Sequence, residues 1–342
     1  MNVQVDPDTL TAKDFTTDQD VRWCPGCGDY AILKAVQKTL PELGVRPEKT
    51  VFVSGIGCAA RFPYYMATYG FHTIHGRAPA VATGVKLANP DLDVWVVSGD
   101  GDALSIGGNH LLHVLRRNVD LQFLLFNNEV YGLTKGQYSP TSRLGQRTPS
   151  TPQGSIDSPL NACVLAIGAG ARFVARGIDI QAKPLSEVLK AAYRHKGASF
   201  VEIIQNCVVF NEDAFADFTE KAVAADTQLH VVNGEPLIFG KEKNKGIHFS
   251  TETLTLEVGT IGEDGFTEDD VLTHDETNPV IAHMLAGMDL PTFPVAMGVL
   301  YQNPAPSYEG QVSDQMDAVK AKAKGKGDID ALLRSGNTWT VN

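Results

Sequence analysis

The sequence predicts an α/β fold in which helices cover both faces of a parallel β-sheet, with a C-terminal extension after it. Short apolar runs at 50–54 (TVFVS), 94–98 (VWVVS) and 121–126 (LQFLLF) have the length and composition of buried strands. Segments with helical periodicity lie between such runs, and turns containing glycine or asparagine follow them. This alternation is typical of a parallel sheet, whose ligands bind at the carboxyl ends of its strands.

The other elements of this sheet domain are expected in chain order. The first 20 residues form a polar arm, and a compact turn at 24–28 (CPGCG) precedes a helix over 30–40. A helix over 108–117 carries Leu111, Leu112 and Leu115 on one face. The loop over 135–158 is rich in Ser, Thr, Pro, Gly and Gln, and a loop of this length is usually functional or at an interface. The alternation is completed by a helix over 160–168, a strand over 173–175, a helix over 185–194 and a strand over 200–204.

The pattern changes near residue 215, so we divide the chain into a domain over 1–215 and a C-terminal extension over 216–342. The proline-rich segment NPAPSYEG (303–310) suits either an arm over a partner or a cover over the site. The extension is expected to contain a charged turn at 241–245, strand material over 247–258, a helix over 278–288, an extended segment over 291–300 and a polar, helix-prone tail over 314–334.

Charge and cysteine content exclude several classes of protein. The 342 residues carry a net charge of −11, and an acidic chain without a basic stripe is not expected to bind nucleic acid. The N-terminus has no basic segment followed by an apolar one, and no apolar run approaches the roughly 18 residues of a membrane span. We therefore expect a cytoplasmic protein without membrane association. In that compartment, five cysteines indicate metal binding or catalysis rather than disulfides.

The strongest motif is Gly99-Asp100-Gly101, followed after 25 residues by Asn127-Asn128. The two glycines permit a sharp turn and a close approach of backbone N–H groups to a phosphate. The carboxylate of Asp100 and the amide oxygen of Asn128 are hard oxygen ligands that suit Mg²⁺. An isolated Gly-Asp-Gly is ordinarily a simple turn. Here both halves of the motif end predicted strands one strand–helix–strand crossover apart, which favours a metal–diphosphate site.

The segment GDGDALSIGGNHLLHVLRRNVDLQFLLFNN (99–128) resembles the thiamine-diphosphate signature, a Gly-Asp-Gly with a distal Asn-Asn. The following VYGLTKGQYSPTS (130–142) is similar to the β subunits of 2-oxoacid:ferredoxin oxidoreductases, and most of all to the 2-oxoglutarate type. The resemblance covers about residues 20–215. It implies that the domain over 1–215 has a thiamine-diphosphate-binding fold.

The resemblance implies a role for each residue that matches the family pattern. Asp100, Asn128 and the backbone carbonyl of Val130 are implied to ligate Mg²⁺. An isolated histidine is more often a core residue with satisfied hydrogen bonds, but His75 lies in a His-Gly-Arg turn whose glycine permits close approach to a ligand. The implied contacts to thiamine diphosphate lie in four turns: Gly101 and Asp102; Gly132 and Leu133; Ile56, Gly57, Cys58 and Ala59; and His75, Gly76, Arg77 and Ala78.

Four cysteines lie in turns or at a strand end, namely Cys24, Cys27, Cys58 and Cys207. Four thiolates can hold a [4Fe–4S] cluster or a zinc ion, and spacing alone separates neither from scattered buried thiols. The family resemblance implies that these four cysteines ligate a [4Fe–4S] cluster close to the thiamine. Cys163, in a predicted helix, is expected to be a small core residue.

The implied reaction is the reversible, CoA-dependent oxidative decarboxylation of a 2-oxoacid to an acyl-CoA and CO₂, with electrons passing through the cluster to ferredoxin. 2-Oxoglutarate would give succinyl-CoA, and pyruvate or a branched 2-oxoacid is the alternative substrate. In the family, an α subunit supplies the glutamate that contacts the cofactor's aminopyrimidine, so this chain alone is expected to be inactive. The rival interpretations are a non-oxidative thiamine-diphosphate decarboxylase subunit and a non-catalytic zinc module.

Recognition of a 2-oxoacid requires cations for one or two carboxylates. Arg61, near Cys58, and Lys135 are the candidates, and a solvated charge or a structural ion pair is the alternative for either. A bidentate guanidinium suits the distal carboxylate of 2-oxoglutarate. Arg143, in the loop over 135–158, is a weaker alternative.

Overall fold

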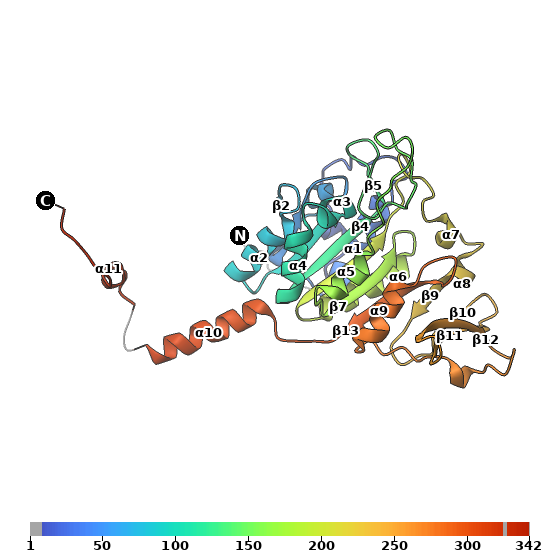
Figure 1. Ribbon diagram of the computed structural model, residues 1–342. Helices are drawn as coiled ribbons and strands as arrows, with labels where there is room; N and C mark the ends of the chain where they lie inside the picture. The colour runs from blue at the N-terminus through green and yellow to red at the C-terminus, as the bar shows by residue number, and fades with distance from the viewer. Residues whose placement is uncertain (1–8, 324–326, 342) are drawn as a thin grey trace.

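The computed structural model describes residues 9–323 and 327–341, and a single mixed sheet dominates this part of the chain (Figure 1). The sheet has eight strands in the order β2-β1-β3-β4-β8-β7-β13-β9. Every neighbouring pair is parallel except β7 with β13. The strands are β1 Thr50–Ser54, β2 Tyr69–His72, β3 Asp93–Gly99, β4 Leu121–Asn127, β7 Phe173–Ile178, β8 Ala198–Ile204, β9 Gln228–Val231 and β13 Val295–Gln302.

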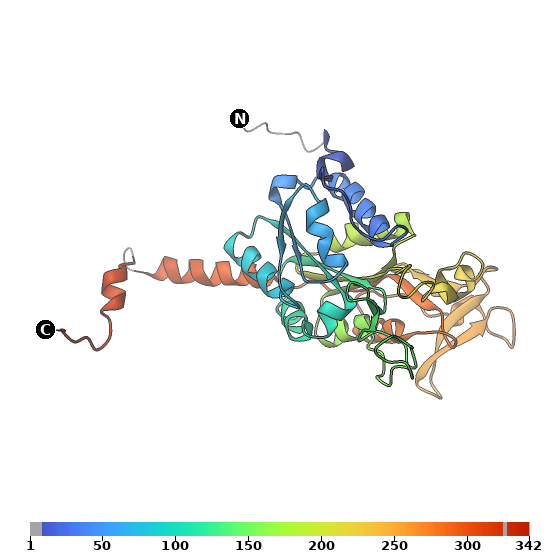
Figure 2. The ribbon, with the colours of Figure 1, turned by 90° about the horizontal axis from the view of Figure 1, so that it is seen from above.

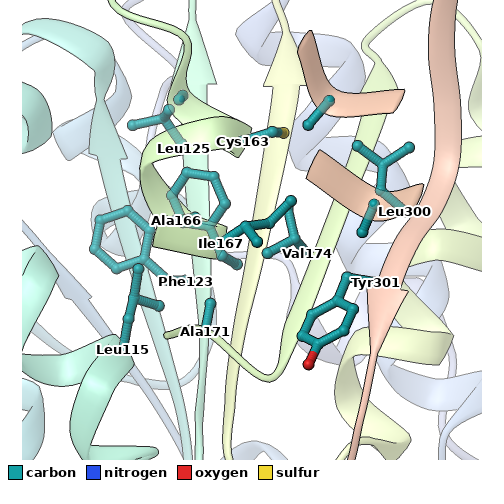
Figure 3. Packing of buried hydrophobic residues seen from close by; sticks show 14 of the residues in the cluster. Leu115, Phe123, Leu125, Cys163, Ala166, Ile167, Ala171, Val174, Leu300 and Tyr301 are labelled. Carbon is teal, nitrogen blue, oxygen red and sulfur yellow. The ribbon is translucent and has the colours of Figure 1, made fainter. Parts of the chain in front are cut away.

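Helices cover both faces of the sheet, as the sequence predicts. On one face, the buried residues of the sheet pack with those of α2 (Ala78–Ala88), α4 (Gly108–Arg117), α5 (Ala162–Gly168) and α9 (Pro279–Gly287). On the other face they pack with α1 (Asp29–Glu42), α6 (Ala182–Arg194) and the 3₁₀ segment η4 (Ala59–Tyr65). Figure 3 shows part of the first layer, where residues of α5 belong to one buried cluster with residues of β4, β7 and β13.

The strand side chains alternate between the two layers because successive residues of a strand point to opposite faces. In β4, Phe123 and Leu125 pack in the first layer, whereas Leu124 and Phe126 pack in the second. All seven residues of β4 are buried. A strand buried on both faces therefore appears in the sequence as a continuous apolar run, which is why the predicted strands agree with the observed ones.

The helices and strands expected between residues 20 and 215 are confirmed, with one correction, whereas residues 1–8 of the predicted polar arm lie outside the described residues. The helix α4 has the predicted bounds, but Leu112 is 39% exposed, and Val114 is buried with Leu111 and Leu115 instead. Residues three and four positions apart share a helix face, whereas Leu112 is turned about 100° from Leu111. In the predicted polar arm, Phe15 at the end of the 3₁₀ segment η2 (Ala12–Phe15) is fully buried.

The C-terminal extension contributes to the main sheet, because β9 and β13 both lie after residue 215. A separate three-stranded sheet, with β10 Ile238–Phe239, β11 Lys245–Ser250 and β12 Thr255–Thr260, lies beside β9. The helix α10 (Tyr308–Lys322) projects away from the rest of the chain in both views (Figures 1 and 2). In the described ranges, no helix combines the length and apolar character needed to span a membrane.

The remaining elements are short. They are the 3₁₀ segments η3 Pro47–Lys49 and η5 Glu268–Asp270, the helices α3 Asp100–Leu104, α7 Ala216–Thr219, α8 Ala224–Thr227 and α11 Ile329–Leu333, and the paired strands β5 Val130–Tyr131 and β6 Gln137–Tyr138.

Candidate cofactor and cluster site

The turns that follow β1, β3 and β4 surround one cavity of about 190 Å³. Because β3 and β4 are parallel neighbours, their carboxyl ends bring Asp100 and Asn128 to the same cavity. The prediction that the two halves of the motif end neighbouring strands is therefore confirmed. The lining comprises Ile56, Gly57, Cys58, Ala59, His75, Gly99, Asp100, Gly101, Asp102, Ile106, Phe126, Asn128, Val130, Tyr131, Gly132, Leu133 and Thr134.

Asp100 is a buried carboxylate with hydroxyl partners but without a cation. Ser139 Oγ and Thr141 Oγ1 donate hydrogen bonds to its Oδ2, at 2.5 Å and 2.7 Å. Burial raises the pKa of Asp100, and the two hydroxyls oppose this shift. Among the ion pairs of residues 9–323 and 327–341, none involves Asp100. A buried carboxylate facing a cavity without an ion-pair partner fits a site for a bound cation.

Asn128 and Val130 supply neutral oxygens beside this carboxylate. Asn128 Nδ2 donates a hydrogen bond to Gln205 Oε1 at 2.7 Å. This bond fixes the orientation of the Asn128 amide, whose oxygen accepts a hydrogen bond from Val130 N at 3.2 Å. A carboxylate, an amide oxygen and a backbone carbonyl form the all-oxygen donor set that Mg²⁺ prefers. The residues present therefore fit a magnesium ion that carries a diphosphate.

Glycines allow the turns around the cavity to pack closely. A Cβ on Gly55 would lie 1.7 Å from Asp102 Oδ2, and one on Gly101 would lie 2.2 Å from the Tyr131 ring. Asp102 itself accepts hydrogen bonds from Gly76 N (2.8 Å) and Ser98 Oγ (2.7 Å). Asp102 thus ties the turn after β3 to the turn at 75–78, in addition to lining the cavity.

The predicted turn at 75–78 contributes to the cavity only through its first residue. His75 is exposed and lines the cavity, so it is not a core histidine. Gly76, Arg77 and Ala78 are not among the lining residues. Gly76 bonds to Asp102, Arg77 precedes the first turn of α2, and Ala78 is fully buried in the core. At the start of α2 these residues take part in packing, and their predicted contacts to the cofactor stay a prediction.

Four cysteines line a second cavity, also of about 190 Å³. They are Cys24, Cys27, Cys58 and Cys207. Cys58 and Cys207 face each other across Gly132, since a Cβ on that glycine would lie 3.6 Å and 3.5 Å from their sulfurs. Cys58, Asn128, Gly132 and Leu133 belong to the walls of both cavities. Three cations, Arg22, Arg61 and Lys135, also line the cysteine cavity.

Burial and neighbouring charges oppose free thiolates in this cavity. They raise the pKa of Cys27 and raise that of Cys58 to about 12. Four cysteines that share one wall, beside compensating cations, fit an iron–sulfur cluster, whose iron ions would stabilise the thiolates. In the ranges described, no three His, Cys, Asp or Glu side chains already converge as metal ligands do. Cys163, by contrast, is a residue of α5 that is fully buried in the core, as expected.

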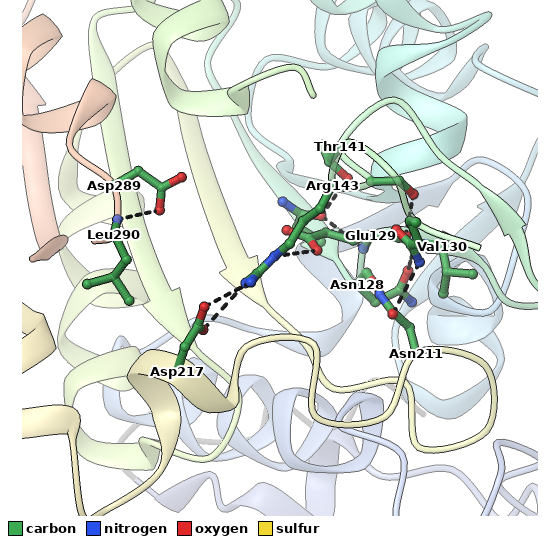
Figure 4. A network of polar contacts seen from close by, with 12 residues as sticks. Asn128, Glu129, Val130, Thr141, Arg143, Asn211, Asp217, Asp289 and Leu290 are labelled. Carbon is green, nitrogen blue, oxygen red and sulfur yellow. Dashed lines mark hydrogen bonds and ion pairs between the residues drawn. The ribbon is translucent and has the colours of Figure 1, made fainter. Parts of the chain in front are cut away.

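The candidate substrate cations differ from Arg143 in their partners. Arg61 and Lys135 form no ion pair within residues 9–323 and 327–341. Arg61 also lines a larger hollow of about 590 Å³, which adjoins the cofactor cavity. The hollow and the cavity share Ile56, Gly57 and Leu133. Arg143 instead pairs with Asp217 at 2.8 Å and with Glu129 at 3.4 Å (Figure 4). Arg143 therefore forms structural ion pairs with side chains of the same chain.

Sequence reasoning missed several residues of the site. Ile106, Phe126, Tyr131 and Thr134 also line the cofactor cavity. Ser139 and Thr141, which bind Asp100, come from the Ser/Thr-rich loop that was expected to be functional. The length and polarity of that loop were the only signal, because nothing in local periodicity indicates that a loop returns to a residue about 40 positions earlier.

Comparisons with known proteins agree with this geometry. Residues 55–203 match the model of the C-terminal TPP-binding domain of thiamine pyrophosphate enzymes. The 2-oxoglutarate oxidoreductase subunit KorB of Mycobacterium tuberculosis is 49% identical over 334 residues, which cover 96% of this chain and 88% of that protein. The β subunit of 2-oxoacid:ferredoxin oxidoreductase 1 of Aeropyrum pernix is 50% identical over 196 residues, covering 57% of this chain and 62% of that protein.

A solved structure extends the similarity to nearly the whole fold. The 2-oxoglutarate:ferredoxin oxidoreductase from Magnetococcus marinus, with 2-oxoglutarate, coenzyme A and succinyl-CoA bound, superposes with a TM-score of 0.77 at 33% sequence identity. The match covers 97% of both chains. Together with the cavity formed by the strand ends, these similarities show that the chain belongs to the β subunits of the 2-oxoacid:ferredoxin oxidoreductases, a family of thiamine-dependent enzymes.

Proposed function

We propose that this chain, in complex with an α subunit, catalyses the reversible oxidative decarboxylation of 2-oxoglutarate. The reaction consumes coenzyme A, releases succinyl-CoA and CO₂, and transfers two electrons through a [4Fe–4S] cluster to ferredoxin. The names of the M. tuberculosis relative and of the solved M. marinus enzyme, which was found with 2-oxoglutarate, coenzyme A and succinyl-CoA, support this substrate. Pyruvate or a branched 2-oxoacid is the alternative outcome of the assay below.

The chain's own residues would hold the cofactor in defined ways. Asp100, Asn128 and the carbonyl of Val130 would bind Mg²⁺ and through it the diphosphate, and the turn at 56–59 would line the reactive end. Bound thiamine diphosphate supplies an electron sink for decarboxylation, a chemistry that no protein side chain provides. The domain over 1–215 would carry these ligands together with the cluster. The remaining proposed cofactor contacts are His75, Gly76, Arg77, Ala78, Gly101, Asp102, Gly132 and Leu133.

The observation that carries the oxidative proposal is the position of Cys58. This residue lines the cofactor cavity and also the cavity of the four cysteines, so the two cavities adjoin each other. Such proximity suits transfer of electrons from cofactor to cluster. A non-oxidative decarboxylase would need the Asp100 and Asn128 pair but would not need four cysteines at this wall.

Arg61 and Lys135 are proposed to bind the substrate carboxylates. Both lack ion-pair partners in the described chain, and Arg61 lines the hollow that adjoins the cofactor cavity. A guanidinium offers two parallel N–H donors to a carboxylate, which suits the distal carboxylate of 2-oxoglutarate. The α subunit would add the glutamate that contacts the aminopyrimidine.

The test is anaerobic purification of the complex with its α subunit, followed by iron, zinc and acid-labile sulfide analysis. Iron and sulfide with broad visible absorbance are expected, whereas a colourless zinc protein would refute the cluster. Turnover is then assayed with several 2-oxoacids, coenzyme A and a one-electron acceptor. The highest kcat/KM is expected for 2-oxoglutarate, and none is expected for the isolated chain. Product formation without reduction of the acceptor would instead indicate a non-oxidative decarboxylase.

A further inference from the structure

A buried series of hydrogen bonds crosses the sheet and ends at Asp100. Its members lie at the end of β3, in the loop over 135–158, and on the strands β4, β8 and β7, and the last of them contacts β13. These strands are neighbours in the sheet. Every polar side chain in the series is at most 5% exposed. From the site outwards, its members are Asp100, Thr141, Asn127, Glu202 and Arg176.

The far end of the series is a rigid ion pair. Arg176 Nε donates to Glu202 Oε2 at 2.7 Å, and its Nη1 donates to the carbonyl of Ala296 in β13 at 3.2 Å. Cys163 Sγ also donates to Glu202 Oε2, at 3.2 Å. A buried carboxylate held by a guanidinium with further hydrogen bonds has a fixed charge and a fixed direction. Glu202 is therefore a stable acceptor at one end of the series.

Glu202 determines the orientation of Asn127. The Asn127 amide nitrogen donates to Glu202 Oε1 at 2.9 Å, and its oxygen accepts from Glu129 N at 3.3 Å. The reverse orientation would place the amide oxygen against a carboxylate and leave that carboxylate without its donor. The Asn127 oxygen is thus held towards Thr141.

Thr141 connects this fixed amide to the proposed metal ligand. Its hydroxyl lies 2.9 Å from Asn127 Oδ1 and 2.7 Å from Asp100 Oδ2. Both of these oxygens are acceptors, so the single hydroxyl proton is shared between them. The hydroxyl is therefore located between two acceptors whose positions the sheet determines. Ser139 Oγ, 2.5 Å from the same Asp100 oxygen, adds a second restraint. With Oδ2 held in this way, rotation of the carboxylate is restricted.

We infer that Thr141 and Asn127 are positioning residues that hold Asp100 for Mg²⁺ by linking it to the Arg176–Glu202 ion pair. This inference rests on the proposed function, which assigns Asp100 as a magnesium ligand. Hydrogen-bond partners of a ligand orient it before the metal arrives, and their loss typically weakens metal affinity. A strand from the C-terminal extension, β13, thereby supports the metal site through Arg176.

The test is the dissociation constant of Mg²⁺ in the complex with its α subunit, measured by calorimetry in the presence of thiamine diphosphate. Thr141→Val removes the hydroxyl at nearly constant volume and is expected to raise this constant roughly 10- to 100-fold. Thr141→Ser restores the hydroxyl and is expected to restore the affinity. Thr39→Val is the matched control, because Thr39 is equally buried but donates to Ala35 O within α1. It is expected to leave the constant unchanged.

A double-mutant cycle tests the link to Asn127. Asn127→Ala is expected to weaken Mg²⁺ binding in the wild-type background and to add little once Thr141→Val is present, because both changes break one path. Full additivity would overturn the link. If Asn127→Ala does not fold by circular dichroism, the Thr141 series decides alone.

The outcomes separate this inference from the proposed function. Failure of the unmodified complex to bind Mg²⁺ with thiamine diphosphate would refute the proposed function itself. Normal binding by the unmodified complex together with unchanged binding by Thr141→Val would overturn only the positioning role.

Discussion

The close contact between Gly55 and Asp102 leads to a prediction for Gly55→Ala. The added methyl group would lie 1.7 Å from Asp102 Oδ2, far inside any van der Waals contact, so the carboxylate must move. Movement breaks its hydrogen bonds from Gly76 N and Ser98 Oγ. The turn after β1, which lines the cofactor cavity, would separate from the turns after β3 and at 75–78.

The magnitude follows from those two bonds. A hydrogen bond to a charged group contributes about 1.5–3 kcal/mol, so losing both costs about 3–6 kcal/mol. Alanine returns up to about 1 kcal/mol by reducing the entropy of the unfolded chain. The net loss is then about 2–5 kcal/mol, and we take about 3 kcal/mol from within this range. With an unfolding entropy of about 2.1 cal/mol/K per residue, this lowers the Tm by about 4 °C.

The assay is thermal and urea unfolding of the full chain, followed by circular dichroism. Gly84→Ala provides the matched control, because Gly84 lies inside α2 and a Cβ there would meet nothing within 4 Å. That control is expected to gain about 0.5–1 kcal/mol from improved helix propensity. The reasoning would be refuted if Gly55→Ala were as stable as the wild-type chain or matched Gly84→Ala.

Three further predictions concern the substrate, the pH dependence of stability and the cysteines. Arg61→Ala should raise the KM for 2-oxoglutarate about 10- to 100-fold, and that for pyruvate much less, because a charge-assisted carboxylate contact is lost; equal effects in steady-state assays would remove Arg61 from specificity. Burial lowers the pKa of His195 to about 4 from 6.5, so the unfolded chain binds a proton first as pH falls through that window. His195 should therefore contribute a decrease of up to about 3 kcal/mol in the free energy of unfolding between these values, which is measured as the difference in pH dependence between the wild-type chain and His195→Leu in urea titrations; identical slopes for the two would contradict the assignment. Cys163→Ala should keep the iron content and cost about 1 kcal/mol of stability, whereas Cys58→Ala should lose iron; iron loss in Cys163→Ala would count against its core role.

Most of the sheet and the location of the cofactor cavity could be predicted because their signals are local. The strands β1, β3 and β4 are buried on both faces, so each forms an apolar run that ends at a turn with glycine or asparagine. Parallel pairing then brings the carboxyl ends together. The expectation that Asp100 and Asn128 suit Mg²⁺ followed from their residue types, whereas the grouping of the four cysteines was implied by the family resemblance and not by their spacing.

Other features depend on contacts between distant segments. The short strand β9 has only four residues, two of them polar, so its place at the edge of the main sheet has no clear sequence signal. The buried face of α4 consists of Leu111, Val114 and Leu115. The prediction placed Leu112 on this face because it is a leucine, and it left out Val114. In the turn at 75–78, the sequence does not indicate that only His75 lines the cofactor cavity, because the packing of Gly76, Arg77 and Ala78 at the start of α2 depends on the tertiary structure.

By itself, the sequence determined which chemical groups stand at the ends of the buried strands, because side-chain type and local periodicity are properties of neighbouring residues. Only the tertiary structure decided which of those groups are already engaged. Arg143 pairs with Asp217, whereas Arg61 lines a hollow and forms no ion pair with any residue that the structure describes. Asp100 accepts hydrogen bonds from hydroxyls of a loop about 40 residues away. The physical reason is that hydrogen bonds and ion pairs act over a few ångströms. Folding alone brings distant segments within that range.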